Sequence, residues 1–426
     1  KAESDNYFPL TNESVALFLM KSDNVCNLIG TSDPSDIVSV EIGDGNLNLV
    51  FLCKGPEASV IVKQALPYVR CIGEAWPLSL ERAFFEYKAL QKQCCFCPDY
   101  TPKLYHFDPM LSAFVMEYIE PPHLILREAL ILGHKYSTFA LHIGSFLAET
   151  LFGSSIFKHS ASEMRRHAVE WKANDAMCAL TEQVVFTDPY VEKDINRWTT
   201  PHLDGQVQSI KSDNQLKIKV SSLKYKFVHL REALVHGDLH TGSVMAKEGS
   251  TYCIDPEFAF YGPMGFDIGA IVANLILSYC SQRGLPPISG GESSREEHGD
   301  WILEQMCKLY NTFHCGFLEM WNETAFDGKC DGFSNALFSS EEDKEMAQFH
   351  YMKNLFDESI GFAGTKMIRR IIGVSHVADM ERIEDVDLKA ECESHAIKIA
   401  LKLIKESSSY KSIEEVAVLA KSLLPN

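Results

Sequence analysis

The 426-residue chain lacks the features that would mark it as a membrane protein or a repeat protein. Its longest apolar run, residues 268–277, is too short to cross a bilayer and predicts a buried helix instead. There is no internal repeat and no low-complexity tract, and the N-terminus has no apolar signal core. The chain also begins without Met, which is compatible with a removed leader. We therefore expect a soluble protein that does not bind membranes.

The sequence also lacks a regular cysteine framework and an excess of positive charge. Its thirteen cysteines are an odd number with irregular spacing, and a chain this long needs no disulfides, so we expect a reducing, cytoplasmic compartment. Cys94 and Cys97 form one CxxC spacing without the second pair or the histidines that structural zinc needs, which predicts an unligated loop. The net charge of −18 argues against nucleic-acid partners, and a solvated surface explains it more simply than a cationic substrate does.

The pattern of apolar residues predicts two lobes of different composition, as expected for a chain longer than one core usually supports. The first part alternates in the manner of β-strands, with one helix over 80–93, and the part after residue 124 has mainly helical spacing. We predict an α+β fold with a small mixed lobe over residues 1–119 and a larger helical lobe over residues 120–426. The expected strands are 38–42, 47–53, 59–64 and 114–119; the expected helices are 136–152, 162–180, 267–281, 301–321 and 341–356; residues 281–300 are the expected loop.

Two acidic clusters, about seventeen residues apart, carry most of the functional information. Asp238 follows a short apolar run, and an aspartate beside an acceptor hydroxyl can take its proton as the bond to phosphorus forms. Asp255 and Glu257 offer the hard oxygen ligands that suit Mg²⁺ shared with ATP phosphates. An ordinary acidic turn explains either cluster alone about as well. Their order and spacing together favour phosphoryl transfer.

Residues of the expected small lobe could bind the phosphates of ATP. Lys63 ends an apolar strand and could reach them, with Glu86 on the following helix to orient it; the alternative is a strand-end lysine that reaches into solvent. Upstream, the sequence predicts a hairpin turn whose glycines could bring backbone amides close to a phosphate, although such a sequence is also common in ordinary turns. That turn consists of Gly43, Asp44, Gly45 and Asn46.

Three further residues have both a functional and a structural interpretation. Asp267 could brace the loop that carries Asp238, but a helix N-cap would explain it nearly as well. Arg369 and Arg370 could bind substrate oxygens and stabilise the charge of a transferring phosphoryl group. A solvated arginine pair is the usual alternative.

In combination these motifs resemble the 5-methylthioribose kinases, a family in the small-molecule branch of the protein-kinase-like fold. The resemblance extends from the glycine turn to the arginine pair and covers most of the chain. The matching runs are Arg70–Pro77 with its tryptophan, His236–Ser243, Asp255–Glu257, Gly265–Gly269 and Arg369–Gly373.

This resemblance implies a bilobal kinase-like fold that transfers the γ-phosphate of ATP, with Mg²⁺, to the 1-hydroxyl of 5-methylthioribose in methionine salvage. It also implies a homodimer, a nucleotide-binding first lobe, and a second lobe that holds the sugar. The implied roles are Asp238 as catalytic base in contact with the sugar; Asp255 and Glu257 as metal ligands; Lys63 as phosphate ligand; Arg369 and Arg370 at the sugar and the transferring phosphoryl group; Trp76 closing over the site; and Met116, Glu117 and Tyr118 facing the adenine.

Two departures from the protein-kinase pattern argue against protein substrates. Ser243 stands where those enzymes have a metal-binding Asn, and Glu257 replaces the glycine of Asp-Phe-Gly. An aminoglycoside or choline kinase is the nearest alternative, although the arginine pair would repel such cations if it lines the site. A nucleotide-binding pseudokinase is the other alternative, and the presence of Lys63 and Asp238 together with both acidic residues argues against it.

Overall fold

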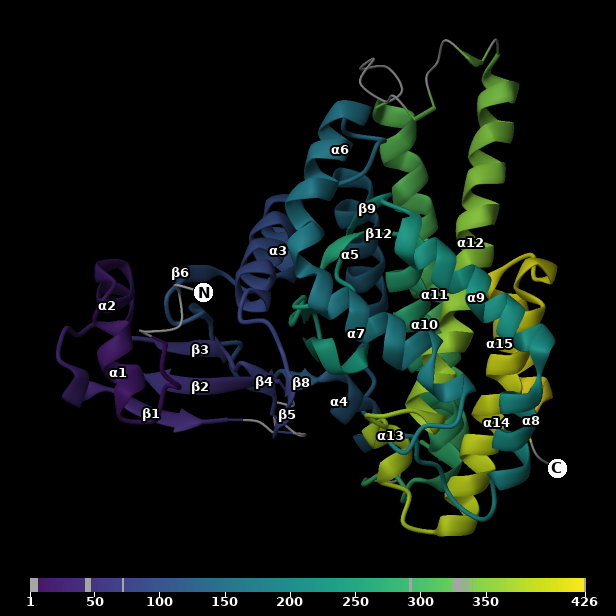
Figure 1. The fold of residues 1–426 in the computed structure, drawn as a ribbon, viewed down its shortest axis with the longest axis horizontal. Helices are drawn as coiled ribbons and strands as arrows, with labels where there is room; N and C mark the ends of the chain where they lie inside the picture. The colour runs from purple at the N-terminus through teal and green to yellow at the C-terminus, as the bar shows by residue number, and fades with distance from the viewer. Residues whose placement is uncertain are drawn as a thin grey trace.

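The computed structural model describes residues 7–42, 47–70, 73–290, 293–324, 332–333, 337–338 and 340–424. Figure 1 shows a small lobe built on a β-sheet, joined to a larger lobe of helices, and so confirms the predicted α+β architecture. The exact division after residue 119 stays a prediction.

The small lobe is built on a five-stranded antiparallel sheet whose two faces bury different residues. Its strands run in the order β1 (Val38–Glu41), β2 (Asn48–Lys54), β3 (Ser59–Ala65), β7 (Ala113–Glu117) and β6 (Leu104–Asp108).

Successive side chains of a strand point to opposite faces, so the register decides what each helix of this lobe covers. Phe51 and Val62 pair and face α1 (Ser14–Leu19) and α2 (Asp23–Ile29), whereas Leu52 and Ile61 pair and face α3 (Arg82–Phe96). Lys63 lies two residues beyond Ile61 and therefore also faces α3. Figure 1 shows that helix between the sheet and the helical lobe.

The centre of the large lobe is α10 (Met264–Ser281), in which every residue is buried. Continued to Gly284, it is the one described helix long and apolar enough to cross a membrane, and its apolar window is completely buried in the protein. Helices α11 (Arg295–Thr324), α12 (Glu341–Ile372) and α14 (Val386–Lys405) pack against it. The predicted buried helix over 268–277 is confirmed.

The remaining elements connect these layers or close the large lobe. Two short antiparallel pairs carry the loops of the acidic clusters: β9 (Ala233–Val235) with β12 (Phe260–Gly262), and β10 (Val244–Lys247) with β11 (Ser250–Cys253). The others are η1 (Pro34–Asp36), β4 (Tyr68–Val69), β5 (Gly73–Pro77), η2 (Pro98–Tyr100), β8 (Leu124–Ile125), α4 (Leu126–Leu132), α5 (Phe139–Gly153), α6 (Ala161–Glu170), η3 (Trp171–Asn174), α7 (Asp175–Phe186), η4 (Asp188–Tyr190), α8 (Asp204–Ser212), α9 (Asn214–His229), η5 (Thr241–Ser243), η6 (Gln282–Gly284), α13 (Ala378–Glu381), η8 (Ser407–Ser409) and α15 (Ile413–Ser422).

Three predicted boundaries in the helical lobe are wrong. Helix α12 continues to Ile372 instead of ending at 356, because its glycines allow close helix packing: a Cβ on Gly364 would lie 2.7 Å from the Ala400 carbonyl oxygen. Helix α11 already begins at Arg295, inside the predicted loop 281–300. The predicted helix 162–180 is interrupted at η3, where the Asn174 amide donates to the carbonyls of Glu257 and Ala259 at 3.0 and 2.8 Å.

A fourth correction concerns the small lobe, where Cys94 and its neighbours belong to the last turn of α3 and not to a loop. The eleven cysteines among the described residues are all free, which agrees with the absence of a disulfide framework.

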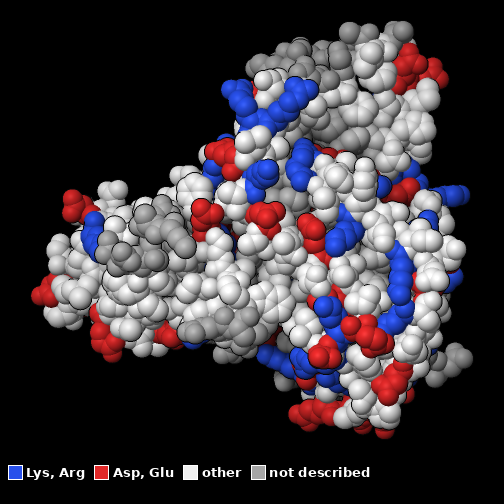
Figure 2. All heavy atoms as spheres, in the orientation of Figure 1, with Lys and Arg blue, Asp and Glu red and all other residues white. Residues whose placement is uncertain are grey.

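The negative net charge is spread over the surface seen in Figure 2. Acidic and basic side chains are interspersed over the helical lobe in this view. This distribution fits a solvated surface better than a site for cations.

Candidate active site

A cavity of about 410 Å³ lies between the two lobes and collects most of the residues that the motifs single out. The small lobe contributes Lys63 and Trp76 to its wall, and the large lobe contributes both acidic clusters and the arginine pair. The sequence-predicted residues in this wall are Lys63, Trp76, Asp238, Ser243, Asp255, Glu257, Arg369 and Arg370.

Some sequence-predicted residues lie beside this cavity or outside the described part of the chain. Glu86 is behind Lys63, and Met116, Glu117 and Tyr118 lie at the end of β7, where the chain passes into the large lobe. The four residues Gly43, Asp44, Gly45 and Asn46 lie outside the described residues.

The loop that carries Asp238 is held from behind by Asp267. The Asp267 carboxylate accepts hydrogen bonds from the backbone N–H groups of His236 and Gly237 at 2.5 and 2.9 Å. Helix α10 already begins at Met264, so Asp267 lies within its first turn and is not the N-cap. Gly237 has φ +84°, and a Cβ there would lie 2.2 Å from the Phe258 carbonyl oxygen. The turn therefore requires glycine both for its dihedral angle and for space.

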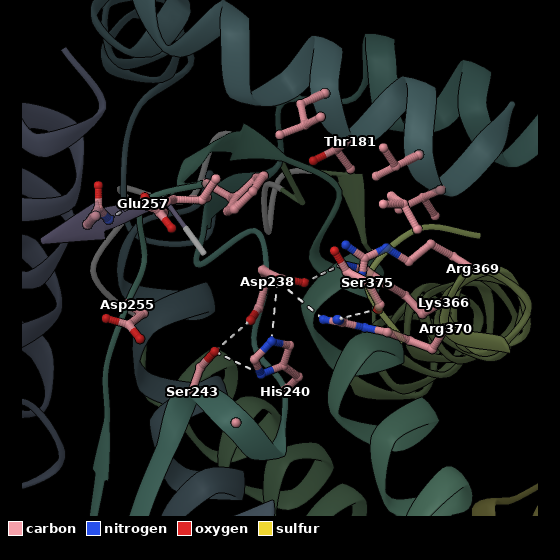
Figure 3. A pocket seen from close by; sticks show the side chains of 18 of the residues that line it. Thr181, Asp238, His240, Ser243, Asp255, Glu257, Lys366, Arg369, Arg370 and Ser375 are labelled. Carbon is pink, nitrogen blue, oxygen red and sulfur yellow. Dashed lines mark hydrogen bonds and ion pairs between the residues drawn. The ribbon is translucent and has the colours of Figure 1, made fainter. Parts of the chain in front are cut away.

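Asp238 lies among basic side chains at the centre of the cavity (Figure 3). Its Oδ1 atom is 2.8 Å from Lys366 Nζ, and its Oδ2 atom is 3.6 Å from Arg370 Nη2 and 3.4 Å from His240 Nε2. Burial opposes the charged form of Asp238, but Lys366, His240 and the arginine pair outweigh it and hold its pKa well below the usual range. Asp238 is therefore an anion at neutral pH.

Lys63 joins the two lobes through ion pairs on both sides. Its Nζ atom lies 2.7 Å from Glu86 Oε1 on α3 and 2.7 Å from Asp255 Oδ1 in the large lobe. Burial opposes the charge of Lys63, but Asp255, Glu86 and Glu257 outweigh it and raise its pKa. The alternative of a lysine that reaches into solvent is wrong, because Lys63 is 5% exposed.

The second acidic cluster offers oxygen ligands to a cation. Asp255 has φ +64°, a conformation that few residues other than glycine adopt and that is often retained at functional sites. Asp255 Oδ1 contacts Lys63, and Glu257 Oε2 accepts a hydrogen bond of 2.9 Å from the Asn48 amide. Within the described residues no hydrogen bond engages the other oxygen of either carboxylate. Two hard anionic oxygens on one wall of the cavity fit Mg²⁺.

The arginine pair lies opposite these carboxylates (Figure 3); Arg370 is buried and Arg369 is half-buried, so the alternative of a solvated pair is wrong. Arg370 Nη1 donates to the Ser375 carbonyl at 3.1 Å. The Nε and Nη1 atoms of Arg369 and the Nε atom of Arg370 are buried and have no hydrogen-bond partner within the described part of the chain. Because buried donors are nearly always paired, these open donors are available to the oxygen atoms of a ligand.

Ser243 keeps its hydroxyl within the loop. The Ser243 Oγ donates to the Asp238 carbonyl oxygen at 3.1 Å and lies 2.9 Å from His240 Nδ1. It stabilises the backbone next to Asp238 in the position where protein kinases have a metal-binding Asn.

The sequence interpretation missed several residues of the cavity. Lys366 lies one helical turn before the arginine pair on α12, and a lysine in a helix carries no signal of burial. Asn48 and Arg82 contact Glu257 from the small lobe and belong to no recognisable motif. An apolar wall was also missed, because α7 contributes only part of it and the rest comes from distant segments: Leu180, Val184 and Val185 of α7, with Phe258 and Val374.

The fold and the site together define a class of protein: a bilobal phosphotransferase with an aspartate loop between a lysine–glutamate pair and a basic helix. In agreement, residues 40–288 match the phosphotransferase enzyme family APH.

Similar proteins identify a narrower family within this class. "Methylthioribose kinase 1" of Oryza sativa subsp. japonica is 43% identical over 415 residues, which cover 97% of this chain and 95% of the relative. "Methylthioribose kinase 2" of the same plant is 41% identical, with 99% and 97% covered. "Methylthioribose kinase" of Escherichia coli O45:K1 (strain S88 / ExPEC) is 39% identical, with 89% and 90% covered. The chain belongs to the family of the methylthioribose kinases.

Proposed function

We propose that the protein transfers the γ-phosphate of ATP to the 1-hydroxyl of 5-methylthioribose, giving 5-methylthioribose 1-phosphate in methionine salvage. One observation carries this proposal: Asp238 lies between two carboxylates suited to a metal and an arginine with open donors (Figure 3). The relatives, whose names state this activity, support the same acceptor.

In the proposed reaction Asp238 orients the sugar hydroxyl and accepts its proton. The hydroxyl oxygen forms a bond to the γ-phosphorus, the bond from that phosphorus to the bridging oxygen breaks, and ADP leaves. Because its pKa is low, Asp238 is a weak base, which fits a loose transition state in which the proton moves late. Asp267 keeps Asp238 in position through the loop backbone.

The small lobe and the second acidic cluster hold the nucleotide in this proposal. Lys63 binds the phosphates and Glu86 keeps it oriented; Asp255 and Glu257 hold Mg²⁺, which when bound neutralises phosphate charge. The adenine faces Met116, Glu117 and Tyr118. The turn Gly43, Asp44, Gly45 and Asn46 covers the phosphates, and Trp76 closes over the sugar.

The far side of the cavity suits a sugar with an apolar substituent. Arg369 and Arg370 meet the sugar oxygens and the transferring phosphoryl group, whereas the wall of Leu180, Val184, Val185, Phe258 and Val374 meets the methylthio group. A pocket with one polar and one apolar side accepts methylthioribose better than ribose, which has no apolar end to bury.

A cationic acceptor fits this cavity poorly. Arg369, Arg370 and Lys366 all line it, so an aminoglycoside or choline would place its positive charge against three cations. A pseudokinase is not favoured either, because the lysine, the base and both candidate metal ligands are present in one cavity.

We also propose that the protein works in the cytoplasm, which its free cysteines support, and that it forms a homodimer as the family resemblance implies.

The test is ATP turnover with methylthioribose, ribose, choline and kanamycin as acceptors, measured with and without Mg²⁺. We expect methylthioribose to have the highest kcat/KM and Mg²⁺ to be required. Asp238→Asn should lower kcat by about 10²–10⁴-fold while ATP still binds. Absence of activity on methylthioribose would overturn the proposed function, and near-normal turnover by Asp238→Asn would remove Asp238 from its role.

A further inference from the structure

Lys366 is a third cation at Asp238 and belongs to no motif of the sequence. It lies on α12 four residues before Arg370, so both side chains project from one face of that helix toward Asp238 (Figure 3). Its ammonium group is closer to Asp238 than either arginine of the pair: Lys366 Nζ lies 2.8 Å from Oδ1, and Arg370 Nη2 lies 3.6 Å from Oδ2.

The surroundings of Lys366 give it few other partners. Its side chain is 5% exposed, its Nζ lies 4.3 Å from the centre of the Phe266 ring, and Asp238 is its one hydrogen-bond partner among the described residues. An ammonium group has three donors, and burying it costs several kcal/mol unless it is paired. A buried lysine with spare donors at the wall of a reaction cavity is therefore placed to bind something else.

The contacts of Asp238 lead to the same conclusion. In this structure Lys366 engages Oδ1, and Arg370 and His240 lie near Oδ2, so both oxygens of the carboxylate have a partner. A substrate hydroxyl needs one of these oxygens in order to pass its proton to Asp238. As the hydroxyl binds, Lys366 shares Asp238 or leaves it, and in the proposed reaction the attacked phosphoryl group offers negative oxygens to its spare donors.

We propose that Lys366 is a catalytic residue whose ammonium group moves from Asp238 to an oxygen of the transferring phosphoryl group as the sugar hydroxyl binds to Asp238. The inference rests on the proposed function. Lys366 remains protonated throughout: the hydroxyl proton goes to Asp238, the new bond forms between the hydroxyl oxygen and the γ-phosphorus, and the electrons of the broken bond leave with ADP. Lys366 thus frees the base and stabilises the charge that develops beside it.

A pH profile distinguishes this role from a structural one. The charged and titratable groups around Lys366 and Asp238 are His240 of the same loop, Asp267 of α10, Arg127 of α4, and Arg369 and Arg370 of α12. Replacing Lys366 by Met removes the largest of the contributions that lower the pKa of Asp238, so that pKa rises. Asp238 acts as an anion, so its protonation abolishes activity. As the pH is lowered, Lys366→Met should therefore lose activity at a higher pH than the wild type does.

The experiment compares Lys366→Met and Lys366→Arg with a matched control, Lys211→Met. Lys211 is also buried, with Nζ 2.7 Å from Glu192 and 4.6 Å from the Trp198 ring, but it is not among the residues that line the cavity. We expect Lys366→Met to lower kcat on methylthioribose by about 10²–10³-fold, with a smaller change in KM and an acid limb at higher pH. Lys366→Arg should recover part of kcat, and Lys211→Met should keep both the wild-type rate and the pH profile.

A second measurement separates this inference from the proposed function. Binding of Mg²⁺·ADP with aluminium fluoride, which imitates the transferring phosphoryl group, needs no acceptor. Lys366→Met should weaken this binding at least tenfold while ADP alone binds as to wild type. Wild-type affinity for the fluoride complex, or wild-type kcat and pH profile on an active acceptor, would overturn the role of Lys366. Lys366→Met could lose the fluoride complex while the wild-type protein does not phosphorylate methylthioribose. That result would overturn only the identity of the sugar.

Discussion

At the scale of single residues, the active site keeps positive charges buried that the protein alone does not neutralise. Arg369 is the clearest case, because two of its donor atoms are buried without a partner in the described structure and its pKa is lowered, with burial as the main cause. Such a group destabilises the folded state by the desolvation that no hydrogen bond offsets. In the proposed function Arg369 binds the substrate, and this role comes at the expense of stability.

We therefore predict opposite effects of Arg369→Met on stability and on activity. The free enzyme should become more stable, with an increase of up to about 2 kcal/mol in the free energy of unfolding, because two buried donors without partners are removed. The KM for methylthioribose should rise about 10–100-fold, as expected when a charged hydrogen bond to the substrate is lost. Chemical denaturation without ligand and steady-state kinetics measure the two effects. A loss of stability together with unchanged KM would contradict this explanation.

The residues that the sequence could predict are those whose chemistry depends on near neighbours in the chain. Asp238 and Asp255 follow short apolar runs in a recognisable order, and Lys63 follows an apolar run in a predicted strand, so each could be proposed from local patterns. Lys366 could not, because what defines it is burial against Phe266 and contact with Asp238, which come from other elements. A pattern along one helix contains no information about what the tertiary structure places opposite it.

At the scale of elements, the loop after β9 depends on one backbone position. Gly237 combines a positive φ with a close approach to the Phe258 carbonyl, and the hydrogen bonds from this loop to Asp267 depend on that conformation. A side chain at this position would move either the loop or the segment that follows Asp255.

We predict that Gly237→Ala lowers kcat strongly and destabilises the protein by more than the strain of positive φ alone, which is about 1–3 kcal/mol. The matched control is Gly249→Ala. Gly249 also has positive φ, +78°, but a Cβ there would have nothing within 4 Å, so this variant should show only the strain and keep its activity. Thermal unfolding and kcat of the two variants decide the matter. Equal effects in both would show that the contact with Phe258 is unimportant.

The length of α12 could not be predicted from the sequence, because it depends on how α12 packs against another helix. Glycines such as Gly364 usually mark loops or weaken helices, so the sequence beyond 356 does not favour a continued helix. In the structure Gly364 lies against the Ala400 carbonyl of α14, where any larger side chain would separate the two helices. Helix–helix packing thus overrides local propensity in the segment that leads to the arginine pair.

At the scale of the whole molecule, the two lobes meet through polar contacts at the catalytic cavity. Lys63 of β3 pairs with Asp255, and Asn48 of β2 donates to Glu257 while accepting a hydrogen bond of 2.9 Å from Arg82. Both candidate metal ligands belong to the large lobe, and these contacts connect each of them to a side chain of the small lobe. In the proposed function, the binding of nucleotide and metal is therefore coupled to the arrangement of the lobes.

We predict that Asn48→Ala raises the Mg²⁺ concentration needed for half-maximal activity and lowers stability by about 1–3 kcal/mol, because Glu257 loses its orientation and buried Arg82 loses a partner. Asn311→Ala, which removes an exposed contact with Glu414, is the control and should change neither. A titration of activity with Mg²⁺ tests this. An unchanged Mg²⁺ requirement in Asn48→Ala would argue against Glu257 as a metal ligand.

The single helix α12 should exchange its amide hydrogens at very different rates along its length. None of its first ten residues, 341–350, is buried, whereas every residue from Ser359 to Ile372 is buried except Arg369, which is half-buried. The first turns can fray in isolation, but the later amides exchange only when the large lobe opens as a unit. Hydrogen–deuterium exchange should show protection that increases along about 48 Å of continuous helix. The arginine pair is thus anchored at the slow-exchanging end, so cuts or insertions at the fast-exchanging end should leave catalysis intact.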